Sequence, residues 1–237
     1  IDPITDRERG LALLDQIKYF PFTVTDVTKK EGREAPLRLF DLTSLQVECN
    51  KKFAYSADET LKIIQSLYEK KVATYPRVDT TYLSDDIYPK CPGILKGLRD
   101  YETFTAPLTG TALLKSKKVF DNSKVTDHHA IIPTGQGLNA LGSVSLTAQR
   151  VYETIVRRFL CIFYPPAVYQ KVSLVTKLDG ESFFSSFKVL KEEGYLKIAT
   201  NSFARKKASD SEKGSNGEEE EVSCDTVLLE ALQKLNE

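Results

Sequence analysis

The sequence predicts a multi-domain α and β protein in which a helical domain is inserted into a strand-rich one. Three features of its 237 residues support this fold class. Apolar residues recur at helical spacing through residues 37–165, where we place the helical domain, and strand-like alternation occurs on both sides of that region. A polar stretch with almost no apolar side chain, residues 204–222, follows. Because strands lie at both ends of the helical region, an insertion explains the order better than two domains in series.

The chain before the helical domain predicts one helix and one strand. Residues 5–18 have apolar side chains three apart with charged residues between them, which is typical of an amphipathic helix. Residues 20–29 predict a strand, and the charged residues 30–36 predict a loop. We therefore assign residues 1–36 to the first part of the strand-rich domain.

Two capped helices open the helical domain. Thr43 begins one capping box and Ser56 begins another, and an apolar stripe follows each of them. We expect the second helix to end near Val72. Further along, residues 83–100 predict a short helix that is interrupted at its prolines, and residues 146–164 predict the longest helix of the chain.

Strands return after the helical domain. Residues 168–176 and 182–189 alternate on either side of an Asp-Gly turn, which predicts a hairpin, and residues 195–199 predict a further short strand. We assign residues 166–200 to the second part of the strand-rich domain. Residues 201–237 are expected to form a flexible acidic loop that ends in a short helix.

Composition limits the classes of protein that remain. Lys plus Arg and Asp plus Glu both number 33, so the overall charge indicates no particular partner. The four cysteines form no C-x-x-C pair, and we expect them to be reduced, with Cys49 and Cys161 buried on apolar helical faces. No apolar run is long enough to span a bilayer, and the N-terminus has no signal-peptide pattern. We therefore expect a soluble, cytoplasmic protein without a membrane partner.

The junction after the second helix carries chemically active side chains. Pro76 disfavours the helical conformation for the residue before it, so the segment is expected to be extended. Tyr75, Arg77 and Asp79 then share one face, while Pro76 and Val78 face apolar neighbours. A phenol has a pKa of about 10, but a neighbouring cation favours the reactive phenolate, and the planar fork of Arg77 also suits a phosphate. A plain helix-to-loop junction would show the same residues.

A second polar group follows further along the chain. His128 and His129 are adjacent, so in an extended loop they point to opposite sides and only one of them can face a given ligand. A histidine can contact a phosphate oxygen or protonate a leaving group near neutral pH, but it can also simply bond to Asp127 or to the backbone. A run of lysines precedes the histidines: Lys115, Lys117 and Lys118. These side chains could contact phosphate, or they could simply form a solvent-exposed face.

Several motifs, in this order, resemble the central region of type IA DNA topoisomerases. The resemblance covers about residues 7–200 and includes residues 39–46 (LFDLTSLQ), 74–79 (TYPRVD) and 127–134 (DHHAIIPT). The doubled histidine and the Tyr-Pro-Arg form are more similar to the topoisomerase III branch than to bacterial topoisomerase I. In the family, an α-helical domain that bears the tyrosine is inserted into a β-rich arch domain. The resemblance therefore implies that this chain has part of the prokaryotic type I topoisomerase fold.

The resemblance implies an ATP-independent isomerase in which Tyr75 is the nucleophile. It would attack a phosphodiester of single-stranded DNA and form a 5′-phosphotyrosyl link, and religation after strand passage would relax negative supercoils or decatenate DNA. Arg77 would hold the scissile phosphate, and Asp79 would orient Arg77 or help to hold the loop. His128, at the first position of the family's H-x-A-I-x-P-T motif, would contact phosphate. The residues expected to bind DNA or to support the site are Asp79, Thr80, Lys115, Lys117, Lys118, His129 and Thr134.

The resemblance also implies parts that this sequence does not match. Val78 stands where the family usually has Thr, so any hydroxyl contact from that position is missing. The acidic domain that binds Mg²⁺ in the full-length enzyme is expected to precede this chain, which itself would hold no metal or other cofactor. We therefore expect a monomeric fragment, inactive alone, whose partners are single-stranded DNA and the remaining domains of the same polypeptide. The implied location is the bacterial cytoplasm, on the nucleoid.

A different class of function is compatible with the same residues. The chain could be a non-catalytic nucleic-acid-binding module that uses the lysine run together with the arginines of the helix over residues 146–164.

Overall fold

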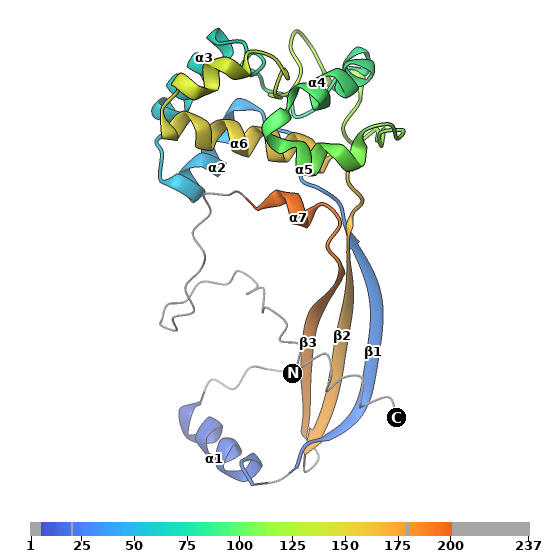
Figure 1. Ribbon diagram of the computed structural model, residues 1–237. Helices are drawn as coiled ribbons and strands as arrows, with labels where there is room; N and C mark the ends of the chain where they lie inside the picture. Colours follow the sequence, from blue (N-terminus) through green and yellow to red (C-terminus); the bar gives the residue numbers. More distant parts are fainter. Residues whose placement is uncertain (1–5, 20, 179–180, 201–237) are drawn as a thin grey trace. The chain divides into compact units, whose positions relative to one another are not determined.

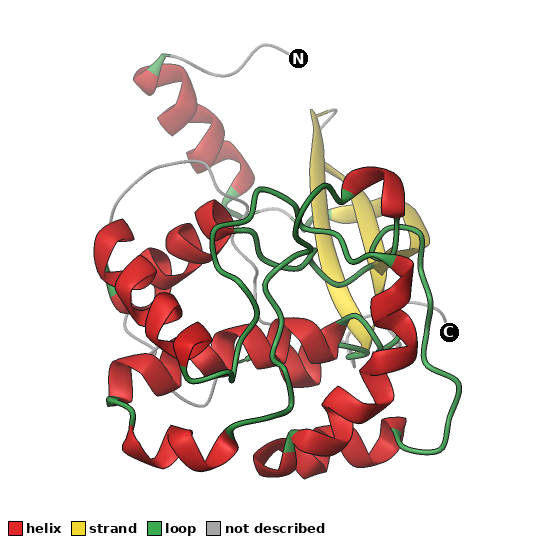
Figure 2. Cartoon of the chain, turned by 90° about the horizontal axis from the view of Figure 1, so that it is seen from above, coloured by secondary structure: helices red, strands yellow, loops and turns green. Residues whose placement is uncertain are grey.

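The computed structural model describes residues 6–19, 21–178 and 181–200 and divides them into two compact units. The helical unit contains residues 35–167 and 193–200, and the strand unit contains residues 6–34 and 168–192. Figure 1 labels the elements of the two units, and Figure 2 distinguishes their helices from their strands by colour. The chain is therefore multi-domain α and β, as predicted.

The strand unit contains a three-stranded sheet in the order β1-β2-β3. Strand β2 (Ala167–Leu178) pairs antiparallel with β3 (Glu181–Glu192). This hairpin was predicted, although the Asp179–Gly180 turn itself lies outside the described residues. Helix α1 (Arg7–Ile17) begins at its cap Asp6, and the predicted N-terminal helix is thereby confirmed.

Strand β1 (Thr23–Glu34) is longer than the sequence indicated. Residues 30–34 were expected to lie in a loop because they are charged, and this prediction was wrong. Nearly every residue of β1 is exposed, so charged side chains on it lose little hydration. Glu34 also pairs with Lys188 of β3, with 2.6 Å between its Oε2 and Nζ.

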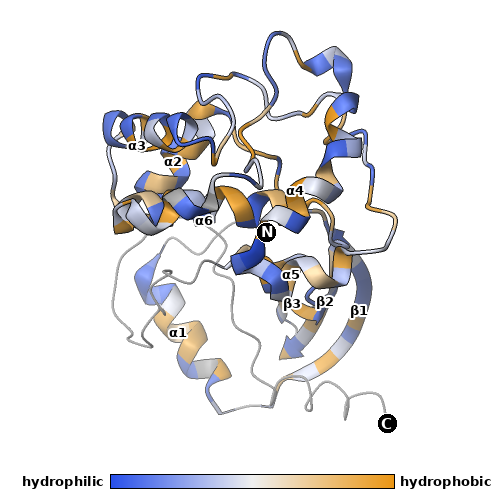
Figure 3. Ribbon diagram, turned by 45° about the horizontal axis from the view of Figure 1, so that its top comes forward, coloured by the Kyte–Doolittle hydropathy of each residue, from blue (hydrophilic) through white to orange (hydrophobic). Residues whose placement is uncertain are grey.

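The core of the helical unit lies around α6 (Leu146–Cys161), which packs on α3 (Ala57–Glu69) and α7 (Leu196–Ala199). Figure 1 shows α6 crossing this unit, and Figure 3 shows polar and apolar residues mixed along its helices, as expected where one face is buried. The predicted inward residues of α6 and its C-cap Ile162 are at most 6% exposed: Val151, Ile155, Phe159 and Ile162.

The other helices of this unit are short, apart from α2 (Leu42–Phe53), which packs on α3. They are α4 (Cys91–Gly97), α5 (Glu102–Thr105) and the 3₁₀ turns Asp85–Lys90, Arg99–Tyr101, Ala106–Leu108, Asn122–Lys124 and Leu138–Ser143. The interrupted helix over residues 83–100 is confirmed. Pro92, however, lies in the first turn of α4, where its missing N–H costs nothing.

The first capping box was misplaced. Asp41, not Thr43, caps α2: its carboxylate accepts the Ser44 N–H at 2.7 Å, and the Ser44 hydroxyl accepts the Asp41 N–H at 3.1 Å. Gln46 instead donates its side-chain amide to the Ala57 carbonyl. Ser56 is confirmed as the N-cap of α3, because its Oγ accepts the Glu59 N–H at 3.1 Å, which is one of the two bonds of the predicted capping box.

The segment near residue 195 was also misassigned. Residues 195–199 were predicted as a strand of the strand-rich domain, but Leu196–Ala199 form α7 in the helical unit. Ile198 is fully buried, and its carbonyl accepts a hydrogen bond from Arg157 Nη1 at 2.9 Å. Four residues are too few for a helical period to be distinguished from alternation, so this tertiary contact decides the conformation.

No helix among the described residues is long and apolar enough to cross a membrane.

Candidate active site

The tyrosine and histidine segments lie side by side in the helical unit. Thr74 donates its N–H to the Ile132 carbonyl at 3.0 Å, and its hydroxyl accepts the Ile132 N–H at 3.0 Å. Thr134 donates its N–H to the Val72 carbonyl at 3.0 Å. These bonds join the two motifs although they are far apart in sequence.

The start of α2 ties both segments together. Ile131 donates its N–H to the Phe40 carbonyl at 2.8 Å, and Leu42 donates its N–H to the Val78 carbonyl at 3.1 Å. Phe40 and Ile131 are each 1% exposed. The three motifs at residues 39–46, 74–79 and 127–134 therefore meet in one hydrogen-bonded cluster with an apolar base.

Side chains alternate along the tyrosine segment as the proline rule predicted. Pro76 and Val78 are buried, Arg77 and Asp79 are exposed, and Tyr75 is half-buried. Within the described part of the chain, Arg77 and Asp79 make no ion pair with each other or with any other residue. Asp79 therefore does not orient Arg77 here, and the guanidinium is open to an anion.

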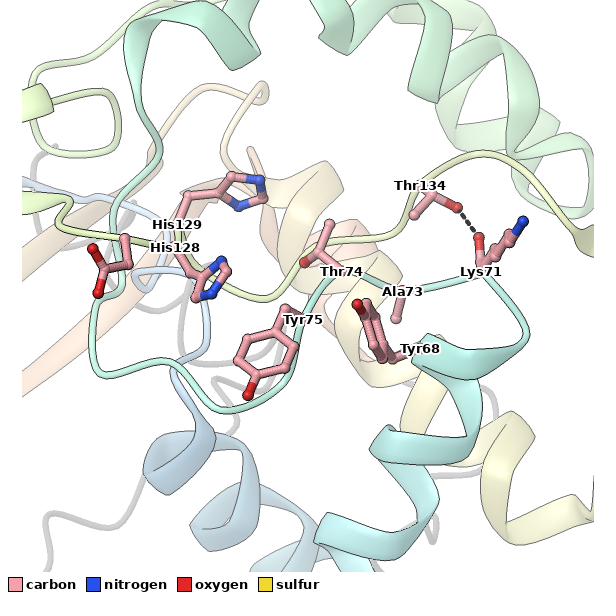
Figure 4. Close-up of a pocket in the computed structure, with 9 residues that line it drawn as sticks. Tyr68, Lys71, Ala73, Thr74, Tyr75, His128, His129 and Thr134 are labelled. Atoms are coloured by element: carbon pink, nitrogen blue, oxygen red, sulfur yellow. Dashed lines mark hydrogen bonds between the residues drawn. The ribbon is translucent and has the colours of Figure 1, made fainter.

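The ring of Tyr75 lies between two other rings. Its centroid is 4.5 Å from that of His128, with 40° between the planes, and 5.5 Å from that of Tyr68, in an edge-on contact. Figure 4 shows this row of three rings. They line a cavity of about 390 Å³ together with residues from the same two segments: Lys71, Ala73, Thr74, Asp127, His129 and Thr134.

The two adjacent histidines have different surroundings. His128 is exposed and lies against Tyr75, whereas His129 is half-buried with its Nδ1 2.8 Å from the Ala130 carbonyl oxygen. Because a carbonyl only accepts, Nδ1 of His129 carries the proton in this contact. Burial lowers the pKa of His129, although the Ala130 carbonyl and the Asp86 carboxylate oppose that effect. His129 therefore makes the backbone contact, and His128 is the one beside the tyrosine.

Two threonines that were expected to bind DNA or support the site make backbone contacts. The Thr80 hydroxyl donates to the Lys124 carbonyl at 2.7 Å and is 8% exposed. The Thr134 hydroxyl donates to the Lys71 carbonyl at 2.6 Å. Both contacts hold the backbone of the loops around Tyr75.

The lysine run lies outside the cavity lining. Lys115 pairs with Asp85, with 2.6 Å between Nζ and Oδ1, and its ammonium lies 5.2 Å from the centroid of the Tyr88 ring. Lys117 and Lys118 are exposed and make no ion pair among the described residues. Within this run of three lysines, Lys117 and Lys118 are therefore the two whose charges are available for a phosphate.

The three arginines of α6 make contacts within the protein. Arg150 Nη1 donates to the Tyr55 hydroxyl at 3.4 Å, and its guanidinium lies 5.9 Å from the centroid of the Phe53 ring. Arg157 is 7% exposed and its Nε lies 2.6 Å from Glu153 Oε1. The Arg158 guanidinium stacks 4.1 Å from the centroid of the Phe40 ring. The arginine surface that a pure binding module would need is therefore not available on this helix.

Sequence reasoning missed two residues of the cavity. Tyr68 looked like one more apolar member of α3, yet it is 39% exposed and touches Tyr75. Lys71 was not singled out, although it ends the helix in a left-handed conformation with φ 61°. An aromatic residue at helical spacing is usually a core residue, so the sequence contained no signal that distinguished Tyr68.

The site contains no metal ligand set and no reactive thiol among the described residues. No group of three or more His, Cys, Asp or Glu among these residues could hold a metal ion by itself. Burial raises the pKa of Cys49, Cys91 and Cys161 to about 12, and all three are free. Cys224 lies outside the described residues.

Comparison with known proteins gives consistent matches. Residues 2–233 match a family described as DNA topoisomerase. The protein called DNA topoisomerase 3 of Bacillus cereus is 39% identical over 184 residues, and its Bacillus subtilis counterpart is 33% identical over 189 residues. These alignments cover 76% and 78% of this chain but 25% and 26% of the relatives. The chain thus spans about a quarter of the length of the curated relatives it matches.

A solved structure shares the fold. Full-length topoisomerase I from Thermotoga maritima, in a monoclinic crystal form, matches with a TM-score of 0.60 at 24% sequence identity. The match covers 92% of this chain and 35% of that chain.

Proposed function

Because this chain belongs to the DNA topoisomerase family, we propose that it is the strand-cleaving part of a type IA enzyme of the topoisomerase III branch. The observation that carries the proposal is the position of Tyr75: its ring is half-buried between His128 and Tyr68, beside a cavity of about 390 Å³. The exposed Arg77 follows two residues later. In this proposal the helical unit is the tyrosine-bearing domain and the sheet is part of the arch.

The chemistry is a phosphoryl transfer from DNA to tyrosine and back. Tyr75 Oη gives up its proton to solvent water and attacks the phosphorus of a single-stranded DNA phosphodiester. A bond forms between Oη and phosphorus, and the bond from phosphorus to the 3′-oxygen breaks, which leaves a 5′-phosphotyrosyl link and a free 3′-hydroxyl. Attack by that hydroxyl reverses the step, so no external energy source is needed.

Two side chains have roles in this transfer. Arg77 would bind the scissile phosphate, because its planar guanidinium can donate two parallel hydrogen bonds and has no competing carboxylate among the described residues. His128 would donate a hydrogen bond to a phosphate oxygen or a proton to the departing 3′-oxygen. Thr74 and Thr134 would hold the two segments in register while the phosphate is bound.

The complete reaction needs more than this chain. We place Mg²⁺, the rest of the DNA cradle and a further acidic group on other domains of the same polypeptide, and we expect the isolated chain to be inactive. The full protein would act on DNA in the bacterial cytoplasm and nucleoid, where it would relax negative supercoils or separate linked molecules.

The experiment uses the full-length gene product and single-stranded oligonucleotides labelled at either end. A 3′-labelled oligonucleotide should give labelled protein after denaturation, because the 5′-phosphate of the downstream piece stays on Tyr75. The 5′-labelled oligonucleotide should give a shortened free fragment. Tyr75→Phe should abolish the adduct, while Tyr68→Phe, which keeps its ring in the same cavity, should retain it. An adduct that survives Tyr75→Phe would overturn the assignment.

A further inference from the structure

The end of α3 has the geometry of a Schellman motif. Val72 donates its N–H to the Leu67 carbonyl at 3.1 Å, and Lys71 donates its N–H to the Tyr68 carbonyl at 2.8 Å. Leu67 and Val72 are fully buried, which provides the apolar contact that accompanies this motif. Glycine is the usual residue at the left-handed position, but here it is Lys71, at φ 61°.

A lysine at this position is strained. A side chain with a Cβ atom disfavours the left-handed region, which glycine enters without steric cost. Backbone strain of this kind is frequently found beside functional sites. Ala54, at φ 60° after α2, shows that strain alone does not identify a function, so a second observation is needed.

The second observation is where the Lys71 side chain lies. Lys71 is one of the residues that line the cavity beside Tyr75, and its side chain is exposed and makes no ion pair among the described residues. Its carbonyl is held by the Thr134 hydroxyl at 2.6 Å, so the backbone that bears the lysine is fixed to the histidine segment. Ala54 is not among the residues that line this cavity. The strained position therefore places an exposed lysine, with no ion pair among the described residues, at the rim of the cavity beside Tyr75.

The direction of the side chain indicates which part of a ligand it would reach. Figure 4 shows the Lys71 ammonium pointing away from the Tyr75 ring, on the side of the cavity opposite His128. An ammonium there would not reach a phosphate at the tyrosine hydroxyl. It would reach a phosphate elsewhere on the same strand, where a flexible point charge suits the backbone of single-stranded DNA.

We propose that Lys71 binds a backbone phosphate of the single-stranded DNA substrate next to the scissile one, and that the strained helix end is what places it there. This inference rests on the proposed function, which identifies single-stranded DNA as the ligand. In this proposal Lys71 holds the DNA strand at the rim of the cavity and takes no part in the transfer of the phosphoryl group.

Binding is tested with the full-length gene product in a Tyr75→Phe background, which prevents cleavage, using fluorescence anisotropy of a labelled oligo-dT. Lys71→Gln should weaken binding about two- to fivefold at low salt. It should also lower the slope of log affinity against log salt by about 0.7, the share of one phosphate contact in a single strand. Lys51→Gln, which removes an exposed lysine of α2, is the charge-matched control and should change neither quantity. Unchanged affinity and slope in Lys71→Gln would overturn the proposal.

The strain is tested by two matched glycine variants. Lys71→Gly and Ala54→Gly both relieve a left-handed residue at a helix end, so both should raise the melting temperature, by about 1–3 °C. Only Lys71→Gly should also weaken DNA binding. If Lys71→Gly fails to raise the melting temperature, the backbone there is not strained and the reason for selecting Lys71 is lost.

Adduct formation distinguishes this inference from the proposed function. With Tyr75 intact, Lys71→Gln should raise the DNA concentration that gives half-maximal adduct and leave the rate at saturating DNA unchanged. Normal binding by Lys71→Gln with a Tyr75-dependent adduct would refute the inference alone. Lys71-dependent binding without any Tyr75-dependent adduct would refute the proposed function alone.

Discussion

Thr74→Val tests the link between the two segments of the site. Valine has nearly the shape of threonine but lacks the hydroxyl that accepts the Ile132 N–H at 3.0 Å. Ile132 is 1% exposed, so water cannot replace this bond. Leaving a buried donor unsatisfied costs about 1–3 kcal/mol, and the second contact of the hydroxyl, 3.4 Å from the Ala130 oxygen, is too long to add much. We therefore expect the free energy of unfolding to fall by about 1–3 kcal/mol.

Urea unfolding measures the change in the free energy of unfolding. A matched variant separates the effect of a displaced Tyr75 from the effect of lower stability. Ile155→Val removes one buried methyl group from α6 at a cost of about 0.5–1.5 kcal/mol. It should keep the covalent adduct, whereas Thr74→Val should slow adduct formation by up to about 10²-fold, because small displacements of a nucleophile have effects of that size. A Thr74→Val protein within about 0.5 kcal/mol of the wild type would refute the reasoning.

Three further changes test other features of the helical unit. Burial lowers the pKa of His129, so this histidine binds a proton less readily in the folded state than in the unfolded state. The free energy of unfolding should therefore fall as pH drops below about 6.5. In His129→Asn, this part of the pH dependence of the urea midpoint should disappear. Gly135→Ala should destabilise strongly, because a Cβ would lie 2.6 Å from the Ile94 oxygen, while Gly110→Ala, also at positive φ but in open space, should cost less in the same thermal melts. In a Cys224→Ser protein, the three buried thiols should react with iodoacetamide only after unfolding; fast reaction of the native protein would contradict their raised pKa and burial.

Local rules predicted those parts of the fold that depend on neighbouring residues. Pro76 alone implied the alternation that buries Val78 and exposes Arg77, and Ser56 marked the start of α3. The hairpin of β2 and β3 followed from alternation about a turn. In each case the physical cause lies within a few residues of its effect.

Features decided by distant contacts were missed or misplaced. Strand β1 is exposed along nearly its whole length, so charged residues can extend it. Helix α7 is held by a hydrogen bond from Arg157, and four residues are too few for the sequence to reveal a helical period. The meeting of Tyr75 with His128 depends on backbone bonds between segments far apart in sequence. It could be expected only from the family resemblance, since no local rule connects the two motifs.

The most direct measurement locates the DNA on the protein. The adduct formed by the full-length gene product would be digested with nuclease and then with trypsin, which should release residues 72–77 between Lys71 and Arg77 as one peptide containing a single tyrosine, Tyr75. We predict that fragment mass spectra will place a nucleotide remnant on Tyr75 of that peptide. A remnant on Tyr68, or on any peptide other than residues 72–77, would contradict the central claim that Tyr75 is the nucleophile.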